Sequence, residues 1–164
     1  LKSFKWLWRR MEYLGTNKNW AKLFSDYGHM ASSIKIWYET LRKKFPNKKL
    51  ITIFQPHQIT RIFTGRDDFI ESFKWYDQII IYDIYAARED ITHFDFSKKG
   101  KNINSIEELG YNFAKSCNWK YINKRTNLED EINKAEEKDI IIVFSAGDVD
   151  YLIRKNINII PTTI

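Results

Sequence analysis

Cysteine, proline and glycine are scarce in this chain of 164 residues, which contains 1, 3 and 6 of them. The single cysteine, Cys117, excludes a disulfide within the chain and fits a reducing compartment, so we expect a cytoplasmic protein. No apolar run approaches the roughly 18 residues that a membrane-spanning helix needs, and the first ten residues do not resemble a signal peptide. We therefore expect neither a secreted disulfide scaffold nor a membrane partner.

Motifs that bind phosphates or metals through one local cluster are also missing. There is no GxxxxGK[ST] loop and no GxGxxG fingerprint, so any ATP that this chain contacts needs its main phosphate-binding loop from elsewhere. The chain has no HExxH, no His-x-His and no cysteine pair, and we predict no metal site within it.

Basic residues are in excess but are not gathered together. The formal net charge is +6, from 27 Lys and Arg against 21 Asp and Glu, and the tightest cluster is Lys98, Lys99 and Lys101 around one glycine. A nucleic-acid-binding domain usually concentrates its basic residues in a patch. We therefore expect no nucleic-acid partner.

What the sequence does contain is an alternation of strand-like and helix-like segments. The runs 50–54, 78–84 and 139–144 are almost continuously apolar, which is typical of strands buried on both faces. We expect a hairpin of residues 10–14 and 21–25, helices over 32–44 and 66–74, and a short strand over 120–123. Thr64 with Asp67, Ser105 with Glu108, and Thr126 with Glu129 have the spacing of capping boxes at helix starts. A last helical turn or two is expected over 149–155.

This order predicts an α/β fold that is Rossmann-like, a three-layer sandwich. The sheet is expected to have about six mostly parallel strands, with helices on both faces and an antiparallel N-terminal hairpin. No repeat or linker interrupts the pattern, so residues 1–164 are predicted to form a single domain.

Polar side chains follow the predicted strands, where ligands bind in open parallel sheets. They are Asp26, Tyr27 and His29, then Gln55, His57 and Arg61, then Asp83, Tyr85, Arg88 and Glu89, and finally Ser145, Gly147 and Asp148. We predict that all these groups lie at one edge of the sheet.

Two of these groups have both a structural and a functional interpretation. His57 and Arg61 are either a loop histidine and a surface arginine, or an anion site for a carboxylate or phosphate. Asp26, Gly28 and His29 are either a turn that caps the next helix, or the site of an anion at that helix N-terminus. The residue types alone leave both alternatives open.

Five stretches, in this order, resemble the C-terminal domain of Mur ligases. They are RRMEY (9–13), FSDYGHMASSIK (24–35), LITIFQPHQITR (50–61), YDIYAARE (82–89) and SAGDVD (145–150). The resemblance covers nearly the whole chain, and its most specific parts are DYGH and the FQPH motif with its following arginine.

The resemblance implies that this is the third domain of an ATP-dependent ligase, whose N-terminal UDP-binding and central ATPase domains are absent from this chain. ATP and Mg²⁺ would be bound mainly by the missing central domain. The most similar members join L-alanine to UDP-N-acetylmuramate through an acyl phosphate, in peptidoglycan precursor synthesis. The alternatives are a ligase that recycles tripeptide onto the same sugar, and a stand-alone, non-catalytic binding module. We expect the isolated domain to be inactive.

The resemblance also implies roles for individual residues. His57 and Arg61 would be catalytic, facing the reacting centre and the carboxylate of the incoming amino acid. The nucleotide would be contacted by Arg10, Asp26, Tyr27 and His29. The chain departs from the family pattern at Met30 and Ala31, which replace His and Pro, and at Gln58, which replaces Arg.

The six tryptophans include several at positions that favour glycine. Trp6 replaces the glycine of a family motif, Trp20 follows Asn19 where a hairpin favours Asn-Gly, and Trp75 and Trp119 each follow a helix. We hypothesise that these residues are glycine in the native protein, encoded by UGA. If they are tryptophan, we expect exposed or strained side chains at positions 6, 20 and 119.

Overall fold

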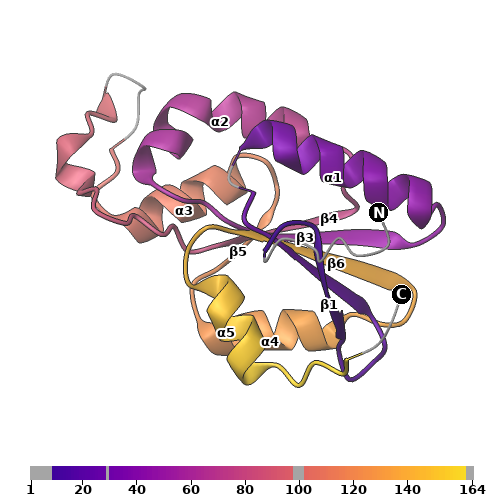
Figure 1. The fold of residues 1–164 in the computed structure, drawn as a ribbon. Coiled ribbons are helices and arrows are strands. Elements are labelled where there is room, and N and C mark those ends of the chain that lie inside the picture. Colours follow the sequence, from indigo (N-terminus) through magenta and orange to yellow (C-terminus); the bar gives the residue numbers. More distant parts are fainter. Residues whose placement is uncertain (1–8, 29, 98–101, 162–164) are drawn as a thin grey trace.

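A computed structural model describes residues 9–28, 30–97 and 102–161, and in it a single six-stranded sheet is covered by helices on both faces (Figure 1). The strands are β1 (Glu12–Thr16), β2 (Lys22–Asp26), β3 (Lys49–Gln55), β4 (Gln78–Tyr82), β5 (Lys120–Ile122) and β6 (Asp139–Ser145). The helices are α1 (Ala31–Lys44), α2 (Ile59–Phe73), α3 (Ile106–Lys115), α4 (Arg125–Lys134) and α5 (Val149–Asn156), with a short 3₁₀ turn, η1 (Ile91–His93).

The sheet is mixed, with the strand order β1-β2-β6-β3-β4-β5. β1 is antiparallel to β2, and every other pair of neighbouring strands is parallel. β6 lies between β2 and β3, and all seven of its residues are buried. The predicted α/β architecture, with its antiparallel N-terminal hairpin, is confirmed.

Each face of the sheet has its own hydrophobic layer. Helices α1, α2 and α3 lie on one face and α4 and α5 on the other (Figure 1). The first layer is rich in aromatic side chains, among them Phe54, Phe73 and Phe144, whereas the second is mainly aliphatic, with Ile141 and Leu128 at its centre. Successive residues of β3 and β6 alternate between the layers, which explains why their sequences are apolar throughout.

The start of α2 differs from its prediction. The helix begins at Ile59, seven residues before the predicted start, and the Thr64 hydroxyl donates to the Thr60 carbonyl (2.8 Å) inside it. The predicted box of Thr64 with Asp67 is therefore wrong, because buried Ile59 and Ile62 extend the apolar face of the helix toward its N-terminus.

The other two predicted capping boxes have opposite outcomes. At α3, Ser105 Oγ accepts from the Glu108 amide (3.1 Å), which confirms Ser105 as the cap, and Glu108 accepts from the Asn104 amide (2.9 Å), one residue before the cap. At α4 the prediction is wrong: the cap residue is Lys124, and no side chain caps the helix.

The tryptophans fall into different environments. Trp20 has a positive φ (66°) and the residue is 55% exposed, as expected for a glycine-like turn position. Trp119 packs edge-on against Phe73 and Phe113, and the left-handed residue after α3 is Asn118 (φ 57°), so that expectation is wrong. Trp6 lies outside the described residues.

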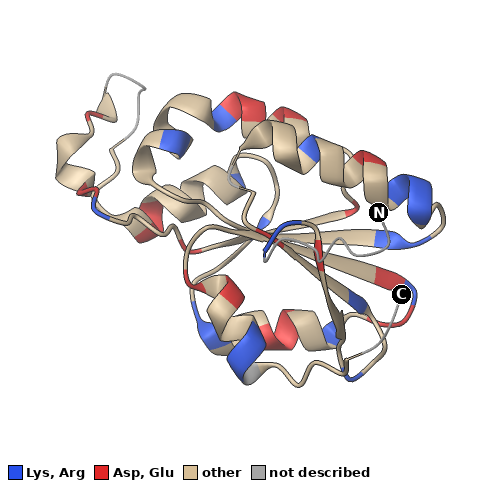
Figure 2. Cartoon of the chain, viewed as in Figure 1, with Lys and Arg blue, Asp and Glu red and all other residues tan. Residues whose placement is uncertain are grey.

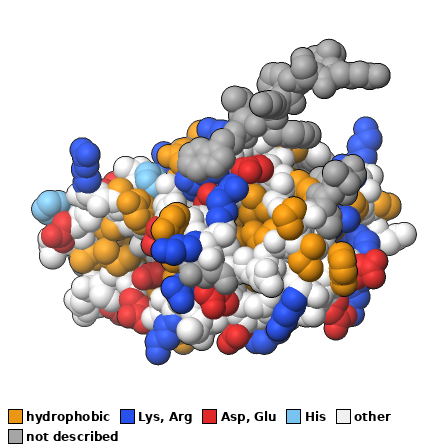
Figure 3. All heavy atoms as spheres, turned by 60° about the horizontal axis from the view of Figure 1, so that its bottom comes forward, with side chains coloured by type: hydrophobic (Ala, Val, Ile, Leu, Met, Phe, Trp, Pro, Cys, Tyr) orange, Lys and Arg blue, Asp and Glu red, His pale blue; other side chains and the backbone are white. Residues whose placement is uncertain are grey.

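Charges of both signs are interspersed over the molecule. Lys and Arg alternate with Asp and Glu along the helices (Figure 2), and the face turned forward in Figure 3 has the same mixture. Among the described helices, none is long and apolar enough to cross a bilayer.

Candidate functional site

The carboxyl ends of the parallel strands place the predicted site residues at one edge of the sheet. Asp26 at the end of β2 pairs with Phe144 of β6, and Phe144 pairs with Phe54 of β3. The loops after β2, β6 and β3 therefore emerge side by side. The loop after β4 joins them through a parallel bridge between His57 and Tyr85.

Arg9 and Arg10 are adjacent and both guanidinium groups lie near the Tyr27 ring, but they differ in burial. The Arg9 guanidinium is buried, donates to the carbonyls of Ser145 and Gly147, and is paired with a carboxylate of α5. Arg10 is exposed, and its guanidinium carbon lies 5.4 Å from the ring centroid of Tyr27. A cation–π contact of this kind holds a cation in place without neutralising it.

Asp26 is buried and accepts hydrogen bonds from the backbone of two different loops. Its Oδ2 accepts from the Met11 amide (2.8 Å) and its Oδ1 accepts from the Gly28 amide (2.5 Å). A β-carbon on Gly28 would lie 2.6 Å from Asp26 Oδ1, so only glycine allows this close approach. Asp26 thereby holds the loop that carries Arg10 beside the loop that follows β2.

The His57 loop is fixed by the loop after β4. The His57 and Tyr85 rings are stacked, with centroids 5.8 Å apart and planes inclined by 17°. The Tyr85 amide donates to the Pro56 carbonyl and the Gln58 amide donates to the Tyr85 carbonyl, both at 2.9 Å. Gln58 itself has a positive φ (72°), so the chain turns sharply between His57 and α2.

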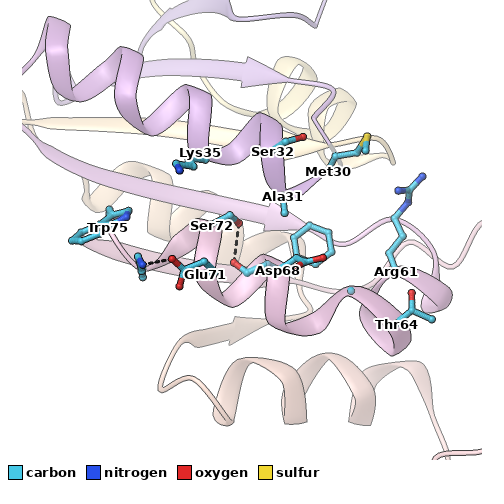
Figure 4. Close-up of a pocket in the computed structure, with 13 residues that line it drawn as sticks. Met30, Ala31, Ser32, Lys35, Arg61, Thr64, Asp68, Glu71, Ser72 and Trp75 are labelled. Atoms are coloured by element: carbon cyan, nitrogen blue, oxygen red, sulfur yellow. Dashed lines mark hydrogen bonds and ion pairs between the residues drawn. The ribbon is translucent and has the colours of Figure 1, made fainter.

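Arg61 lines a groove of about 630 Å³ between α1 and α2 (Figure 4). Met30 and Arg61 lie at one end of this groove and Trp75 lies at the other, with Asp68 and Glu71 between them on the α2 side. Within the described part of the chain, the buried Nε of Arg61 has no hydrogen-bond partner. A guanidinium with a nitrogen that lacks a protein partner is suited to an anion.

A buried network that the sequence interpretation missed connects β3 to β6. Gln55 Nε2 donates to Asp148 Oδ1 (2.8 Å), and Gln55 Oε1 accepts from Ser145 Oγ (2.8 Å) and the Val149 amide (3.2 Å). A β-carbon on Gly147 would lie 2.5 Å from Gln55 Oε1, which explains the glycine in SAGDVD. The signal for this network was the position of polar residues at the ends of two neighbouring strands.

The site residues thus form two groups on one edge. Arg10 precedes β1 and lies with Asp26 and Tyr27 at the end of β2, whereas His57 and Arg61 follow β3, with β6 between β2 and β3. His29, predicted to lie with the first group, is outside the described residues. Among the residues that are described, no three His, Cys, Asp or Glu side chains come together in a cluster that could hold a metal.

Comparison with known sequences identifies one family. The family described as "Mur ligase, glutamate ligase domain" matches residues 9–147. A UDP-N-acetylmuramate–L-alanine ligase from Hydrogenobaculum sp. is 36% identical over 150 residues, which is 91% of this chain and 30% of that protein. The same-named ligase from Clostridium acetobutylicum is also 36% identical, over 91% of this chain and 31% of its own length. This chain therefore spans about three tenths of these relatives.

Solved structures have the same fold. A UDP-N-acetylmuramate-alanine ligase from Thermotoga maritima superposes with a TM-score of 0.59 at 21% identity, covering 90% of this chain and 28% of that one. A murein peptide ligase from Psychrobacter arcticus superposes with a TM-score of 0.66 at 18% identity, covering 94% and 30% of the two chains. At these identities the likeness establishes the fold alone.

Proposed function

The chain belongs to the Mur ligase family, and from that premise we propose that it is the third, C-terminal domain of an ATP-dependent ligase that adds L-alanine to UDP-N-acetylmuramate. The support is the name shared by relatives that are 36% identical over most of this chain. The UDP-binding and ATPase domains would lie in the remaining seven tenths of such a protein. Mg²⁺ would be held there too.

The observation that carries the proposal is the position of Arg61. Its side chain lines the end of the groove beside Met30, the cap residue of α1, and its Nε has no hydrogen-bond partner among the described residues. A guanidinium can bind a carboxylate through two parallel hydrogen bonds, which fixes its orientation. In the proposed role, Arg61 holds the carboxylate of L-alanine and His57 lies beside the reacting centre.

Arg10, Asp26 and Tyr27 provide the proposed nucleotide side of the domain. Arg10 is exposed and held against the Tyr27 ring, so it is available to phosphate oxygens, while Asp26 fixes the two loops. ATP supplies the phosphoryl group that activates the muramate carboxylate. This chain's own part is to orient the two ligands and to exclude water when the domain closes.

The test is phosphate release by the complete protein, with ATP, UDP-N-acetylmuramate and L-alanine. We expect release that depends on L-alanine, and we expect Arg61→Ala to raise the KM for L-alanine by about tenfold or more, because a charge-assisted bond to the carboxylate is lost. The matched control is Arg66→Ala on the same helix, whose guanidinium instead binds Asp67 and Ser116. An unchanged KM in Arg61→Ala would remove that residue from the site.

The choice of amine separates the alternatives. Preference for a tripeptide over L-alanine would indicate the recycling ligase. No phosphate release with either amine would favour a non-catalytic binding module. The 164-residue chain alone is expected to release no phosphate, and a cytoplasmic location stays a prediction.

A further inference from the structure

We propose that Glu89 is a positioning residue, which caps α2 from a neighbouring loop and thereby holds His57 and Arg61 in the geometry that the acceptor amino acid needs. This inference rests on the proposed function. It assigns to the acidic residue at the end of YDIYAARE a task that does not require contact with any ligand.

α2 has no cap of its own. Its cap residue, Gln58, makes no side-chain hydrogen bond to the helix, and the first turn contains no acidic residue. Glu89 makes this contact from outside: Oε2 accepts from the Thr60 amide (2.9 Å) and Oε1 accepts from the Thr60 hydroxyl (2.6 Å). Helix amides that lack such a partner are the first to lose their order.

The same loop also holds His57, which precedes the start of α2. Tyr85 stacks on the His57 ring and exchanges backbone hydrogen bonds with Pro56 and Gln58. Residues 85–89 therefore bind residues 56–60 at both ends, through Tyr85 at the first and Glu89 at the last. His57 lies within residues 56–60, which this loop binds, and Arg61 is the residue that follows them.

The electrostatics favour an ionised Glu89. Burial would raise the pKa of its carboxyl, but the hydrogen bonds from Thr60 and Ile59 and the nearby His57 lower the pKa below its usual value overall. A carboxylate at this position also complements the positive end of the helix. The start of α2 is consequently occupied by a protein side chain, and Arg61 remains for the ligand.

Loss of the Glu89 cap should weaken the binding of L-alanine and leave the binding of ATP nearly unchanged. A shift in the first turn of α2 moves Arg61 directly, and a displacement of about 1 Å at a binding group can cost up to about 100-fold in rate. The proposed nucleotide residues are Arg10, before β1, and Tyr27, after β2, and Asp26 binds the backbone next to each of them. Glu89 contacts a different segment, at Thr60. A general loss of stability would not distinguish between the two sides in this way.

The experiment compares Glu89→Ala and Glu89→Gln in the complete protein. For Glu89→Ala we expect the KM for L-alanine to rise by about tenfold, with the KM for ATP within about twofold of wild type. Glu89→Gln keeps an oxygen that can accept from Thr60, so it should recover most of the loss. The matched control is Asp90→Ala, because Asp90 makes the same kind of contacts one residue later, to the Thr92 amide and hydroxyl.

A second measurement does not depend on ligase activity. In the 164-residue chain, Glu89→Ala should speed hydrogen exchange at the Thr60 amide by at least about tenfold while the amides of β3 stay protected. Unchanged exchange there, equal KM changes for both ligands, or an equal effect of Asp90→Ala would overturn the inference. If the wild-type protein fails to use L-alanine, the proposed function fails, and the exchange result still decides whether Glu89 caps α2.

Discussion

The Nε atom of Arg9 lies 3.3 Å from Oδ2 of Asp150, which joins the beginning of the described chain to α5 near its end. Both side chains are almost fully buried, with exposed fractions of 11% and 3%. Ser25 of β2 donates to the same carboxylate, and Arg154 connects it to Glu12 of β1. This ion network connects β1 and β2 to α5, next to the proposed nucleotide side.

Removal of Asp150 should destabilise the chain strongly. In Asp150→Ala, Arg9 would remain buried without its carboxylate, and we expect the free energy of unfolding to fall by about 3–5 kcal/mol. Urea denaturation of the 164-residue chain measures this change. Asp130→Ala, at an exposed position on α4, is the control and should change stability by less than about 0.5 kcal/mol. Similar losses in both variants would contradict the network's importance.

Substitution of Arg10 should weaken ligand binding, whereas substitution of the adjacent Arg9 should lower stability. Arg10→Ala removes an exposed side chain, so we expect its unfolding free energy to stay within about 0.5 kcal/mol of wild type. In the complete protein its KM for ATP should rise by about tenfold, because one charged contact to phosphate is lost. Arg9→Ala should instead unfold more easily. A normal KM for ATP in Arg10→Ala would exclude its contact with the nucleotide.

Replacement of Trp20 by glycine should stabilise the protein. Trp20 has a φ of 66° and an exposed side chain, so glycine relieves backbone strain without the loss of a buried contact. We expect a gain of about 1 kcal/mol, seen as a higher melting temperature. Trp75→Gly is the control: it is equally exposed, at 55%, but has no positive φ, and it should bring no gain.

Peptide mass spectrometry on native material addresses the hypothesis of UGA-encoded glycine directly. Detection of tryptophan at positions 20 and 75 would end the hypothesis. Trp37 does not have the environment of a glycine position, since it is buried and packs edge-on against Phe24 and Phe144.

Glu131 should give a pH-dependent contribution to stability. Its carboxylate binds Lys120 of β5 and Lys134 of α4, each at 2.7 Å. Burial would raise its pKa, but the two lysines lower it below the usual 4.5. A lowered folded-state pKa stabilises the protein at pH values above about 4.5, and the contribution disappears as the pH falls through that lowered pKa.

We therefore expect Glu131→Gln to lose about 1 kcal/mol of stability at pH 7 and to approach wild type toward pH 3. Urea denaturation at both pH values makes the comparison. Glu136→Gln, which removes the exposed partner of Lys138, should have little effect at either pH. A Glu131→Gln deficit that is the same at pH 3 and pH 7 would contradict the ionic origin.

The strands and the edge of the sheet were predictable because their signals are local. β3, β4 and β6 are apolar runs, and polar residues follow each of them, as a parallel sheet buried on both faces requires. The start of α2 was not predictable in this way. Its cap comes from Glu89, and the sequence around Gln58 contains no capping residue that would mark the boundary.

By itself, the sequence determined the alternation of elements, the layered α/β fold and the edge at which Asp26, His57 and Arg61 emerge, since each follows from short-range patterns of burial and strand direction. Only the tertiary structure decided which neighbouring arginine is buried and which is exposed, because the carboxylate that binds Arg9 is on α5. It also decided that Arg61 lines a groove with the start of α1, since that groove exists only where two helices pack together.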